Sequence, residues 1–407
     1  MSSALSHIRV LELSRILAGP WAGQMLADLG AEIIKVEKPI QGDDTRHWGP
    51  PFLNNKTAEN PTGSAYFLSA NRGKQSITID IRHQEGQAII HQLIDSCDVL
   101  IENFKVGSLV KYHLDYASLS AINPKLIYCS ITGFGQDGPY AQRAGYDFLL
   151  QGMGGLMSVT GEPDHLPGGG PQKVGVALTD ILTGMYATTA IQAAIIEREK
   201  SGLGQHIDLA LLDVQVACLA NQGMNYLVSQ NTPQRMGNAH PNIVPYQTFQ
   251  TADGFIILTI GNDSQFADFC QVANCQTLIH DPHFVTNQAR VHNRDVVIQQ
   301  LANIIKAKKS EFWLQQLEIK GVPCGPINDI AQVFENPQIK HRKMLGELTH
   351  PVNGKVPTVA NPINFSRTPI VYHQAPPNLG EHTENVLIEL LGYDTSTVTE
   401  LRESKII

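Results

Sequence analysis

The sequence predicts an α/β protein, with a parallel sheet in a large first lobe and a smaller second lobe. Residues 8–13 and 32–37 are β-like apolar runs. The helical segment 19–30 between them completes a βαβ unit, which is typical of parallel sheets with helices on their faces. A length of 407 residues favours two lobes over one core, and the sequence becomes rich in Asn and Pro from about residue 225.

The rest of the first lobe continues the alternation of strands and helices. A glycine-rich loop segment, residues 133–170, precedes a β-like run at 174–178 and a helix from 181 to about 200. Gly202 and Gly204 follow this helix and are typical of a C-terminal stop. Further strands are expected at residues 76–80, 99–102, 126–131 and 206–210.

The second lobe is predicted to carry a β-hairpin formed by residues 246–249 and 254–260. The tail, residues 331–407, contains helical pieces joined by Pro-rich extended segments, and we expect it to return to the first lobe. The predicted domains are residues 1–224 (large, Rossmann-like), 225–327 (small) and 328–407 (linker and C-terminal segment).

Composition excludes several classes of partner. A net charge of −8 argues against a nucleic-acid-binding protein. No apolar run reaches membrane-spanning length without a charge, and the first ten residues lack an apolar signal core. The six cysteines are scattered and form no CxxC pair, which favours a reducing, cytoplasmic location. We therefore expect a cytoplasmic protein that contacts neither nucleic acid nor membrane.

Common cofactor and metal motifs are missing. The first βα turn, residues 14–20, is not GxGxxG, so NAD binding has little support. No Walker A loop or GxSxG elbow is found, and the 15 histidines form no HExxH pattern. We expect no metal site and no permanently bound cofactor.

Asp180 is the only charge in the apolar stretch 174–186. It lies between a β-like run and a long helix, where backbone N–H groups and the helix dipole could keep a carboxylate ionised. Such a carboxylate can act as a nucleophile that forms an acyl-enzyme bond. The alternative is that Asp180 is simply the N-cap of the helix.

Cations gather in the loops of the βα region. Loops at the ends of parallel strands are where nucleotides bind, and several cations there suit phosphate groups. The alternative for each residue is an ordinary solvated loop charge. The cations are Lys35, Lys38, Arg46, Arg72, Lys74, Lys105 and Lys111.

Several segments spread over essentially the whole chain match the motifs of one family. The most specific stretch runs from Val10-Leu11-Glu12-Leu13 to Lys35-Val36-Glu37. The other matching segments are residues 42–46, 71–74, 102–104, 133–135, 200–205, 322–326 and 379–383. In these segments the chain resembles the class III CoA-transferases, the superfamily of formyl-CoA transferase, carnitine CoA-transferase and methylacyl-CoA racemase.

The resemblance implies an interlocked homodimer with a Rossmann-like large domain, and it places Asp180 on the family's catalytic aspartate. That residue attacks an acyl-CoA thioester and passes CoA to an acceptor acid through covalent intermediates. The resemblance also implies CoA contacts at Ala18, Lys38, Asn71, Lys74, Asn103, Phe104 and Lys111.

Two departures narrow the function. Tyr146 stands where the racemase branch has a histidine, and residues 236–242 contain one glycine where the formyl-CoA branch has a run. Residues 143–147 with 154–157 and 173–177 are most similar to the subgroup that moves CoA between succinate and other dicarboxylates, such as glutarate. Arg15 or Arg46 could bind the far carboxylate.

The resulting prediction is an acyl-CoA:carboxylate CoA-transferase whose substrates are an acyl-CoA, here succinyl-CoA, and a small carboxylic acid. A 2-methylacyl-CoA racemase and a formyl-CoA:oxalate CoA-transferase remain alternatives. Two alternatives of a different class also remain: an acyl-CoA-binding protein without catalytic activity, and a dinucleotide-binding enzyme.

Overall fold

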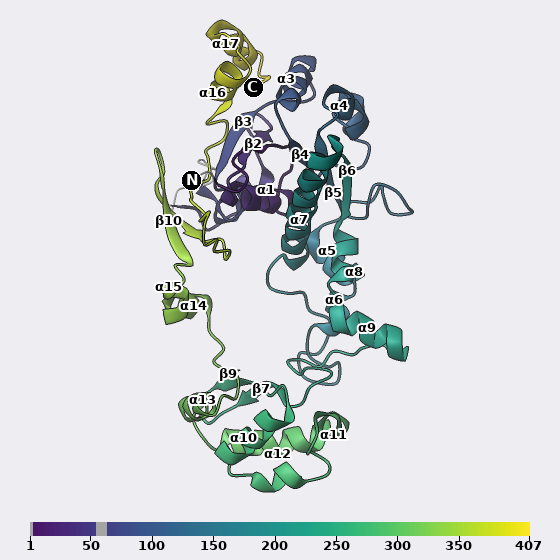
Figure 1. Cartoon of the computed structure of the whole chain (residues 1–407), viewed down its shortest axis with the longest axis vertical. Helices are drawn as coiled ribbons and strands as arrows, with labels where there is room; N and C mark the ends of the chain where they lie inside the picture. Colours follow the sequence, from purple (N-terminus) through teal and green to yellow (C-terminus); the bar gives the residue numbers. More distant parts are fainter. Residues whose placement is uncertain (1–2, 54–62) are drawn as a thin grey trace. The chain divides into compact units, whose positions relative to one another are not determined.

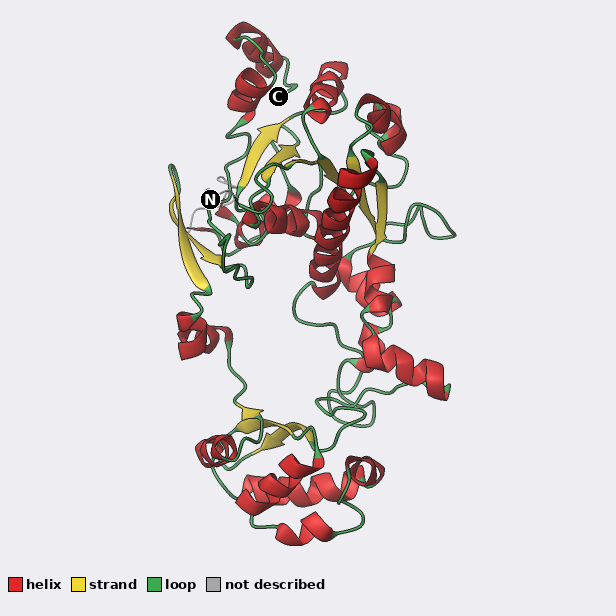
Figure 2. Ribbon diagram, viewed as in Figure 1, coloured by secondary structure: helices red, strands yellow, loops and turns green. Residues whose placement is uncertain are grey.

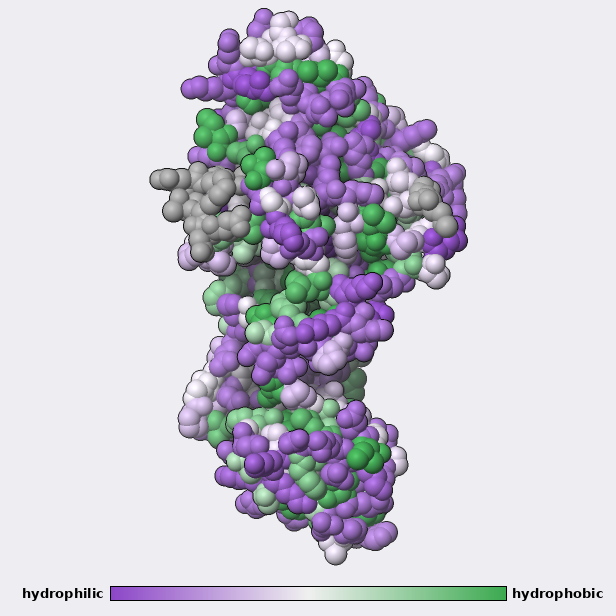
Figure 3. Space-filling view, turned by 90° about the vertical axis from the view of Figure 1, so that its left-hand side faces the viewer, coloured by the Kyte–Doolittle hydropathy of each residue, from purple (hydrophilic) through white to green (hydrophobic). Residues whose placement is uncertain are grey.

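The computed structural model describes residues 3–53 and 63–407. Its chain forms two compact units (Figures 1 and 2). Unit 1 comprises Met1–Gly155, Val174–Gly223 and Gln338–Ile407, and unit 2 comprises Leu156–Lys173 and Met224–Pro337. On the face drawn in Figure 3, hydrophobic side chains are scattered among hydrophilic ones. No helix of the described residues is long and apolar enough to cross a membrane.

Unit 1 is built on a six-stranded parallel sheet in the order β3-β2-β1-β4-β5-β6. Val10 in the central strand pairs with Ile33 on one side and Val99 on the other. The strand order reverses between β1 and β4, which is the doubly wound arrangement. The predicted α/β class is therefore confirmed. The strands are β1 (Arg9–Glu12), β2 (Glu32–Glu37), β3 (Lys74–Thr78), β4 (Val99–Glu102), β5 (Ile127–Thr132) and β6 (His206–Ala210).

Helices cover both faces of this sheet. Alternate residues of a strand point to opposite faces, so neighbouring residues pack against different helices. Val10 packs with α1 (Ala18–Asp28) and α7 (Leu178–Ser201), whereas Leu11 packs with α3 (Gln84–Asp95) and the C-terminal helices. A Cβ atom at Gly184 in α7 would lie 2.8 Å from the Ala18 carbonyl oxygen, so glycine permits the close approach of α7 to α1. The other helices of residues 65–229 are α2 (Ala65–Leu68), α4 (Tyr116–Ile122), α5 (Asp147–Met153), α6 (Leu156–Val159), α8 (Leu211–Ala217) and α9 (Ala220–Ser229).

The β-like run predicted at residues 174–178 is wrong, because residues 174–177 are loop and α7 already begins at Leu178. Val174 donates its backbone N–H to the Gln151 side chain at 2.9 Å instead of joining a strand. The glycine stop is confirmed, since Gly202 has φ 77° directly after α7.

The C-terminal segment is part of unit 1. It opens with an antiparallel hairpin that the sequence did not predict, β10 (Leu345–His350) and β11 (Gly354–Val359). It then runs beside β3, where Thr78 N–H donates to Thr383 Oγ1 at 3.0 Å and Asp80 N–H donates to the Ile406 carbonyl at 2.7 Å. Its helices are α16 (Thr383–Asn385), a π-helical turn (Val386–Leu390) and α17 (Thr395–Glu403).

Unit 2 has its own core around a three-stranded antiparallel sheet. The predicted hairpin is present as β7 (Tyr246–Gln250) and β8 (Phe255–Thr259), and β9 (Cys324–Gly325) completes the sheet. Trp313 is fully buried and donates its Nε1–H to the Ile305 carbonyl at 2.8 Å. The helices of residues 263–341 are α10 (Asp263–Val272), α11 (Asn287–His292), α12 (Arg294–Lys306), α13 (Ser310–Ile319), α14 (Ile330–Glu335) and α15 (Pro337–His341).

Candidate active site

The candidate site lies where β1 and β4 end, at the reversal of strand order in unit 1. Such crevices at the carboxyl ends of parallel strands are the usual ligand sites of doubly wound folds. The loops that follow the two strands are tied together: Arg15 N–H donates to Asn103 Oδ1 at 3.0 Å, and Asn103 Nδ2 donates to the Arg15 carbonyl at 2.7 Å. Two neighbouring pockets open around these loops.

The first pocket, here the Asp180 pocket, has a volume of about 200 Å³. The turn between β1 and α1 forms one wall with Arg15, Ile16 and Ala18, and the end of β4 contributes Asn103 and Phe104. Asp180 enters from the first turn of α7. The loop before α5 closes the pocket with Arg143 and Tyr146.

Asp180 does not cap its own helix. The N-cap of α7 is Ala177, and Asp180 lies three residues further on. Asp147 caps α7 instead, because its Oδ1 accepts the backbone N–H of Thr179 at 2.8 Å and that of Asp180 at 3.3 Å. Among the residues that the structure describes, the Asp180 carboxylate has no hydrogen bond or ion pair.

The expectation that backbone N–H groups keep Asp180 ionised is therefore wrong, because Asp147 occupies two of them. Burial raises the pKa of Asp180 to about 7, and the negative charge of Asp147 adds to the increase. Burial also raises the pKa of Tyr66 to about 12, and the negative charges of Asp180, Asp147 and Asp43 contribute further, smaller increases. Asp180 thus carries an isolated carboxyl group that is poised to change its charge near neutral pH.

The second pocket, here the Lys111 pocket, has a volume of about 390 Å³ and shares Arg15 and Phe104 with the first. Five basic residues line it: Arg15, Lys35, Lys38, Arg82 and Lys111. Lys35 is fully buried and paired with Glu12 and Asp43, and Arg82 forms an ion pair with Asp80 at 2.5 Å. Two buried hydroxyl groups, Ser14 Oγ and Ser108 Oγ, lack a hydrogen-bond partner among the described residues, and both residues line this pocket. Cations and unused hydroxyl groups together suit an anionic, polar ligand.

The structure brings seven of the ten predicted site residues to these pockets. The Asp180 pocket contains Asp180, Arg15, Ala18, Asn103 and Phe104, and the Lys111 pocket contains Lys38 and Lys111 with Arg15 and Phe104. The three residues that line neither pocket are Arg46, Asn71 and Lys74.

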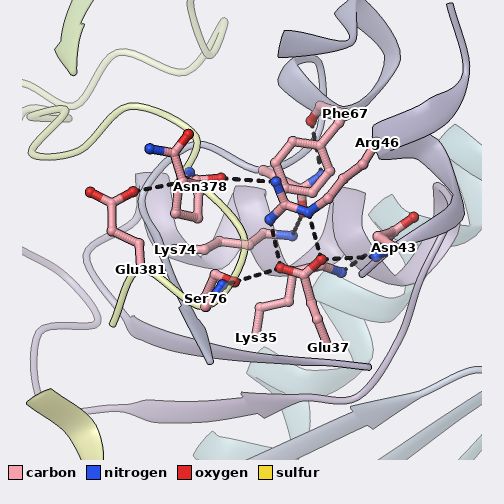
Figure 4. Close-up of polar contacts among 12 residues, drawn as sticks. Lys35, Glu37, Asp43, Arg46, Phe67, Lys74, Ser76, Asn378 and Glu381 are labelled. Carbon is pink, nitrogen blue, oxygen red and sulfur yellow. Dashed lines mark hydrogen bonds and ion pairs between the residues drawn. The ribbon is translucent and has the colours of Figure 1, made fainter. Parts of the chain in front are cut away.

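Lys74 belongs to a buried network of charged side chains (Figure 4), and Asn71 is hydrogen-bonded to it. The Lys74 ammonium group is fully buried, 2.8 Å from Glu12 Oε2, and donates to the Pro20 carbonyl at 2.8 Å and to Asn71 Oδ1 at 3.0 Å. Asn71 in turn donates to the Phe67 carbonyl at 2.9 Å. Their polar groups are used inside the protein, and the expected contact of these residues with CoA stays a prediction.

Arg46 lies in the same network and is also fully buried (Figure 4). Its guanidinium forms a bidentate pair with Glu37 at 2.6 and 2.8 Å, donates to the Pro377 carbonyl at 3.1 Å and stacks on the Phe67 ring at 3.7 Å. The structure therefore places Arg46 in the interior, paired with Glu37 at the end of β2 and outside the lining of both pockets, and its contact with a substrate carboxylate stays a prediction.

Four residues of the site were not found from the sequence: Tyr66, Arg82, Arg143 and Asp147. Arg82 could have been found, because it follows the predicted strand 76–80 at its carboxyl end. Arg143 lies in an irregular loop whose residues carry no periodic signal, and Asp147 is the first residue of α5, which follows this loop. No group of three or more His, Cys, Asp or Glu residues that could hold a metal occurs among the described residues.

Comparison with known proteins agrees with this arrangement. The chain is 53% identical to the succinate–glutarate CoA-transferase of Agrobacterium fabrum over 386 residues, which cover 95% of each chain. It is 43% identical to the human succinyl-CoA:glutarate CoA-transferase over 403 residues, 99% of this chain and 90% of the relative. A crystal structure of a CaiB/BaiF family protein from Brucella suis is 51% identical, with a TM-score of 0.83 over 96% of this chain and 100% of the other.

A profile of CoA-transferase family III matches residues 5–383, which include both pockets. The match spans far more than half of the chain, and the two relatives above extend it to nearly the full length. The chain therefore belongs to CoA-transferase family III.

Proposed function

We propose that this enzyme transfers CoA from succinyl-CoA to glutarate through covalent intermediates on Asp180. The observation that carries the proposal is the Asp180 carboxylate, which has no hydrogen bond or ion pair within residues 3–53 and 63–407 and lines a pocket beside the cations of the Lys111 pocket. The relatives from Agrobacterium fabrum and human, both named for succinate or succinyl-CoA and glutarate, support these two acids as the substrates.

The first half of the reaction would load CoA onto the enzyme. An oxygen of the Asp180 carboxylate attacks the thioester carbonyl of succinyl-CoA, the C–S bond breaks, and CoA leaves as a thiolate. The product is a mixed anhydride of succinate and Asp180. The thiolate then attacks the Asp180 carbonyl and releases succinate, which leaves an aspartyl-CoA thioester.

The second half would unload CoA onto glutarate. A glutarate carboxylate attacks the Asp180 thioester carbonyl and expels the CoA thiolate, which gives a mixed anhydride of glutarate and Asp180. The thiolate attacks the glutaryl carbonyl, forms glutaryl-CoA and restores the Asp180 carboxylate. Every step replaces one activated acyl bond with another, so the transfer needs neither ATP nor a bound cofactor.

The two pockets divide the CoA molecule between them in this proposal. The nucleotide end would bind in the Lys111 pocket, where Lys38, Arg82 and Lys111 offer charge to its phosphates. The thiol end would pass Phe104, which lines both pockets, and reach Asp180 between Ala18 and Asn103. Arg15 lines both pockets as well, although its guanidinium already pairs with Asp44 at 2.6 Å.

We also propose that two copies form the interlocked homodimer of the resemblance. Exposed apolar side chains occur on α7, at Met185, Tyr186 and Ile196, and on α5 and α8, at Phe148 and Val216. Such a set is typical of an interface between subunits. The proposed domains are residues 1–224 for the large CoA-binding domain, 225–327 for the small domain and 328–407 for the linker and C-terminal segment that returns to the large domain. All six cysteines are free, which suits a reducing cytoplasm.

The test is an exchange assay with succinyl-CoA and separate acceptor acids, in which mass spectrometry follows the new thioester. The proposal predicts glutaryl-CoA without ATP, and loss of turnover by orders of magnitude in Asp180→Asn with CoA binding retained. Unchanged turnover in Asp180→Asn would contradict the covalent mechanism. Transfer to oxalate alone, or racemisation of a 2-methylacyl-CoA, would contradict the choice of reaction.

A further inference from the structure

We propose that Arg143 binds the far carboxylate of the dicarboxylyl group while the near carboxylate reacts at Asp180. This inference rests on the proposed function and names the residue that selects for a second negative charge. Arg143 and Asp180 line the same pocket. An acid with a second carboxylate brings its charge into a pocket that already holds the carboxylates of Asp180 and, nearby, Asp147, so a cation is needed there.

Three cationic residues line the Asp180 pocket: Arg15, Lys105 and Arg143. Arg15 is already engaged, because its Nη1 donates to Asp44 at 2.6 Å. Among residues 3–53 and 63–407, no carboxylate lies within ion-pair distance of the Arg143 guanidinium. The charge of Arg143 is therefore available to a ligand.

Aromatic rings hold the Arg143 guanidinium in place. Its central carbon lies 4.6 Å from the centre of the Tyr140 ring and 5.4 Å from that of Phe134, and the two rings meet edge to face at 5.6 Å. A guanidinium that lies against ring faces keeps its N–H groups free at the edge, where they can donate two parallel bonds to one carboxylate. Lys105 has no comparable aromatic contact in the described part of the chain.

The loop that carries Arg143 is fixed against the end of β5. A Cβ atom at Gly145 would lie 2.6 Å from the Gly133 Cα atom, and one at Gly133 would lie 2.8 Å from the Gly145 Cα atom. Only two glycines allow backbones to approach this closely. Arg143 N–H also donates to the Tyr140 carbonyl at 2.9 Å. The cation is thus positioned before a substrate arrives, which lowers the entropy cost of binding.

The experiment compares two acceptors that differ only in the far charge, glutarate and its monomethyl ester, with succinyl-CoA as the donor. We expect the unsubstituted enzyme to prefer glutarate in kcat/KM by about 10- to 100-fold, the range for a charged hydrogen-bonded contact. Arg143→Gln should remove this preference, and Arg143→Lys should restore part of it. The matched control Lys105→Gln, a second cation of the same pocket, should keep the preference.

A second measurement separates this role from a contact with CoA itself. Isothermal titration with free CoA should give a Kd for Arg143→Gln that stays within about 2-fold of the unsubstituted enzyme, since CoA has no far carboxylate. A clear loss of CoA affinity, or a preference for glutarate that survives Arg143→Gln, would overturn the role of Arg143. Absence of succinyl-CoA:glutarate exchange in the unsubstituted enzyme would instead overturn the proposed function.

Discussion

Asp147 caps the helix that carries Asp180, with its Oδ1 3.3 Å from the Asp180 backbone nitrogen and 2.8 Å from that of Thr179. One carboxylate thus stabilises the helix start, and the other is left free to face the pocket. The arrangement costs stability, because the two negative charges repel each other and Asp180 is largely removed from water. Groups that are held in an unfavourable state at the expense of stability are common in active sites.

The pH dependence of turnover should report the charge of Asp180. Only the carboxylate form can attack a thioester, and burial with the charge of Asp147 raises its pKa to about 7. We therefore expect kcat/KM for succinyl-CoA to be constant above this pH and to fall as the pH decreases through about 7. A stopped assay in constant-ionic-strength buffers from acid to alkaline pH measures this. An acid limb near the ordinary aspartate value of 3.8 would contradict the assignment.

Asp147→Asn should move that acid limb to lower pH. An asparagine oxygen can still accept the N–H groups of Thr179 and Asp180, so the cap survives while the charge is lost. Removal of the charge removes the second cause of the raised pKa of Asp180, and the limb should shift towards acid without reaching the ordinary value. The matched variant Asp147→Ala removes charge and cap together. It should shift the limb similarly but lower the melting temperature more.

We expect Lys111→Gln to change mainly the affinity for CoA, and Lys74→Gln to change mainly the free energy of unfolding. Lys111 is exposed in its pocket, so its loss should raise the Kd for CoA about 3- to 10-fold, with a smaller effect at high salt. Lys74 is buried against Glu12, so its loss should leave CoA affinity nearly unchanged and lower the free energy of unfolding by about 3 kcal/mol or more. Titration calorimetry and urea unfolding measure the two effects. Weak CoA binding by a fully stable Lys74→Gln variant would instead support the predicted contact between Lys74 and CoA.

Two neighbouring aspartates should differ sharply in their contribution to stability. Asp43 is buried beside Lys35 at 3.0 Å and accepts the backbone N–H of Ile16 at 3.2 Å, which holds a residue with φ 72° in the pocket wall. Asp43→Ala should cost about 3–5 kcal/mol in urea unfolding, since it breaks a buried pair and releases a strained turn.

The control for Asp43 is Asp44→Ala. Asp44 forms an exposed pair with Arg15, and its loss should cost less than about 1 kcal/mol. Equal losses for the two variants would show that Asp43 does not hold the turn.

The sequence predicted the central strands well because their apolar runs are buried on both faces of the sheet. Prediction failed where the structure depends on a distant partner. Residues 174–177 are apolar enough for a strand, but no strand edge pairs with them. The hairpin of β10 and β11 was missed because Pro357, which pairs with Glu347, lies in a Pro-rich segment that suggests an irregular chain.

The same reason separates the predicted site residues that line a pocket from those that do not. Lys38 lies in a loop and Lys111 in a short 3-10 helix (Val110–Tyr112); both remain exposed, so residue type and position were sufficient to place them at a pocket. Arg46 and Lys74 are equally basic, but they are buried and form ion pairs with Glu37 of β2 and Glu12 of β1. No local pattern reveals such a partner. None reveals that Asp147 caps α7 through the N–H group of Thr179, which lies 32 residues further along the chain.

The most direct test of the proposed mechanism is to trap the covalent intermediate. The enzyme is mixed with succinyl-CoA without an acceptor and treated with hydroxylamine, which attacks a thioester or anhydride, and its peptides are analysed by mass spectrometry. The mechanism predicts a hydroxamate at Asp180, and none at this position in Asp180→Asn. Active exchange without modification of Asp180, or with the hydroxamate on another carboxylate, would contradict it.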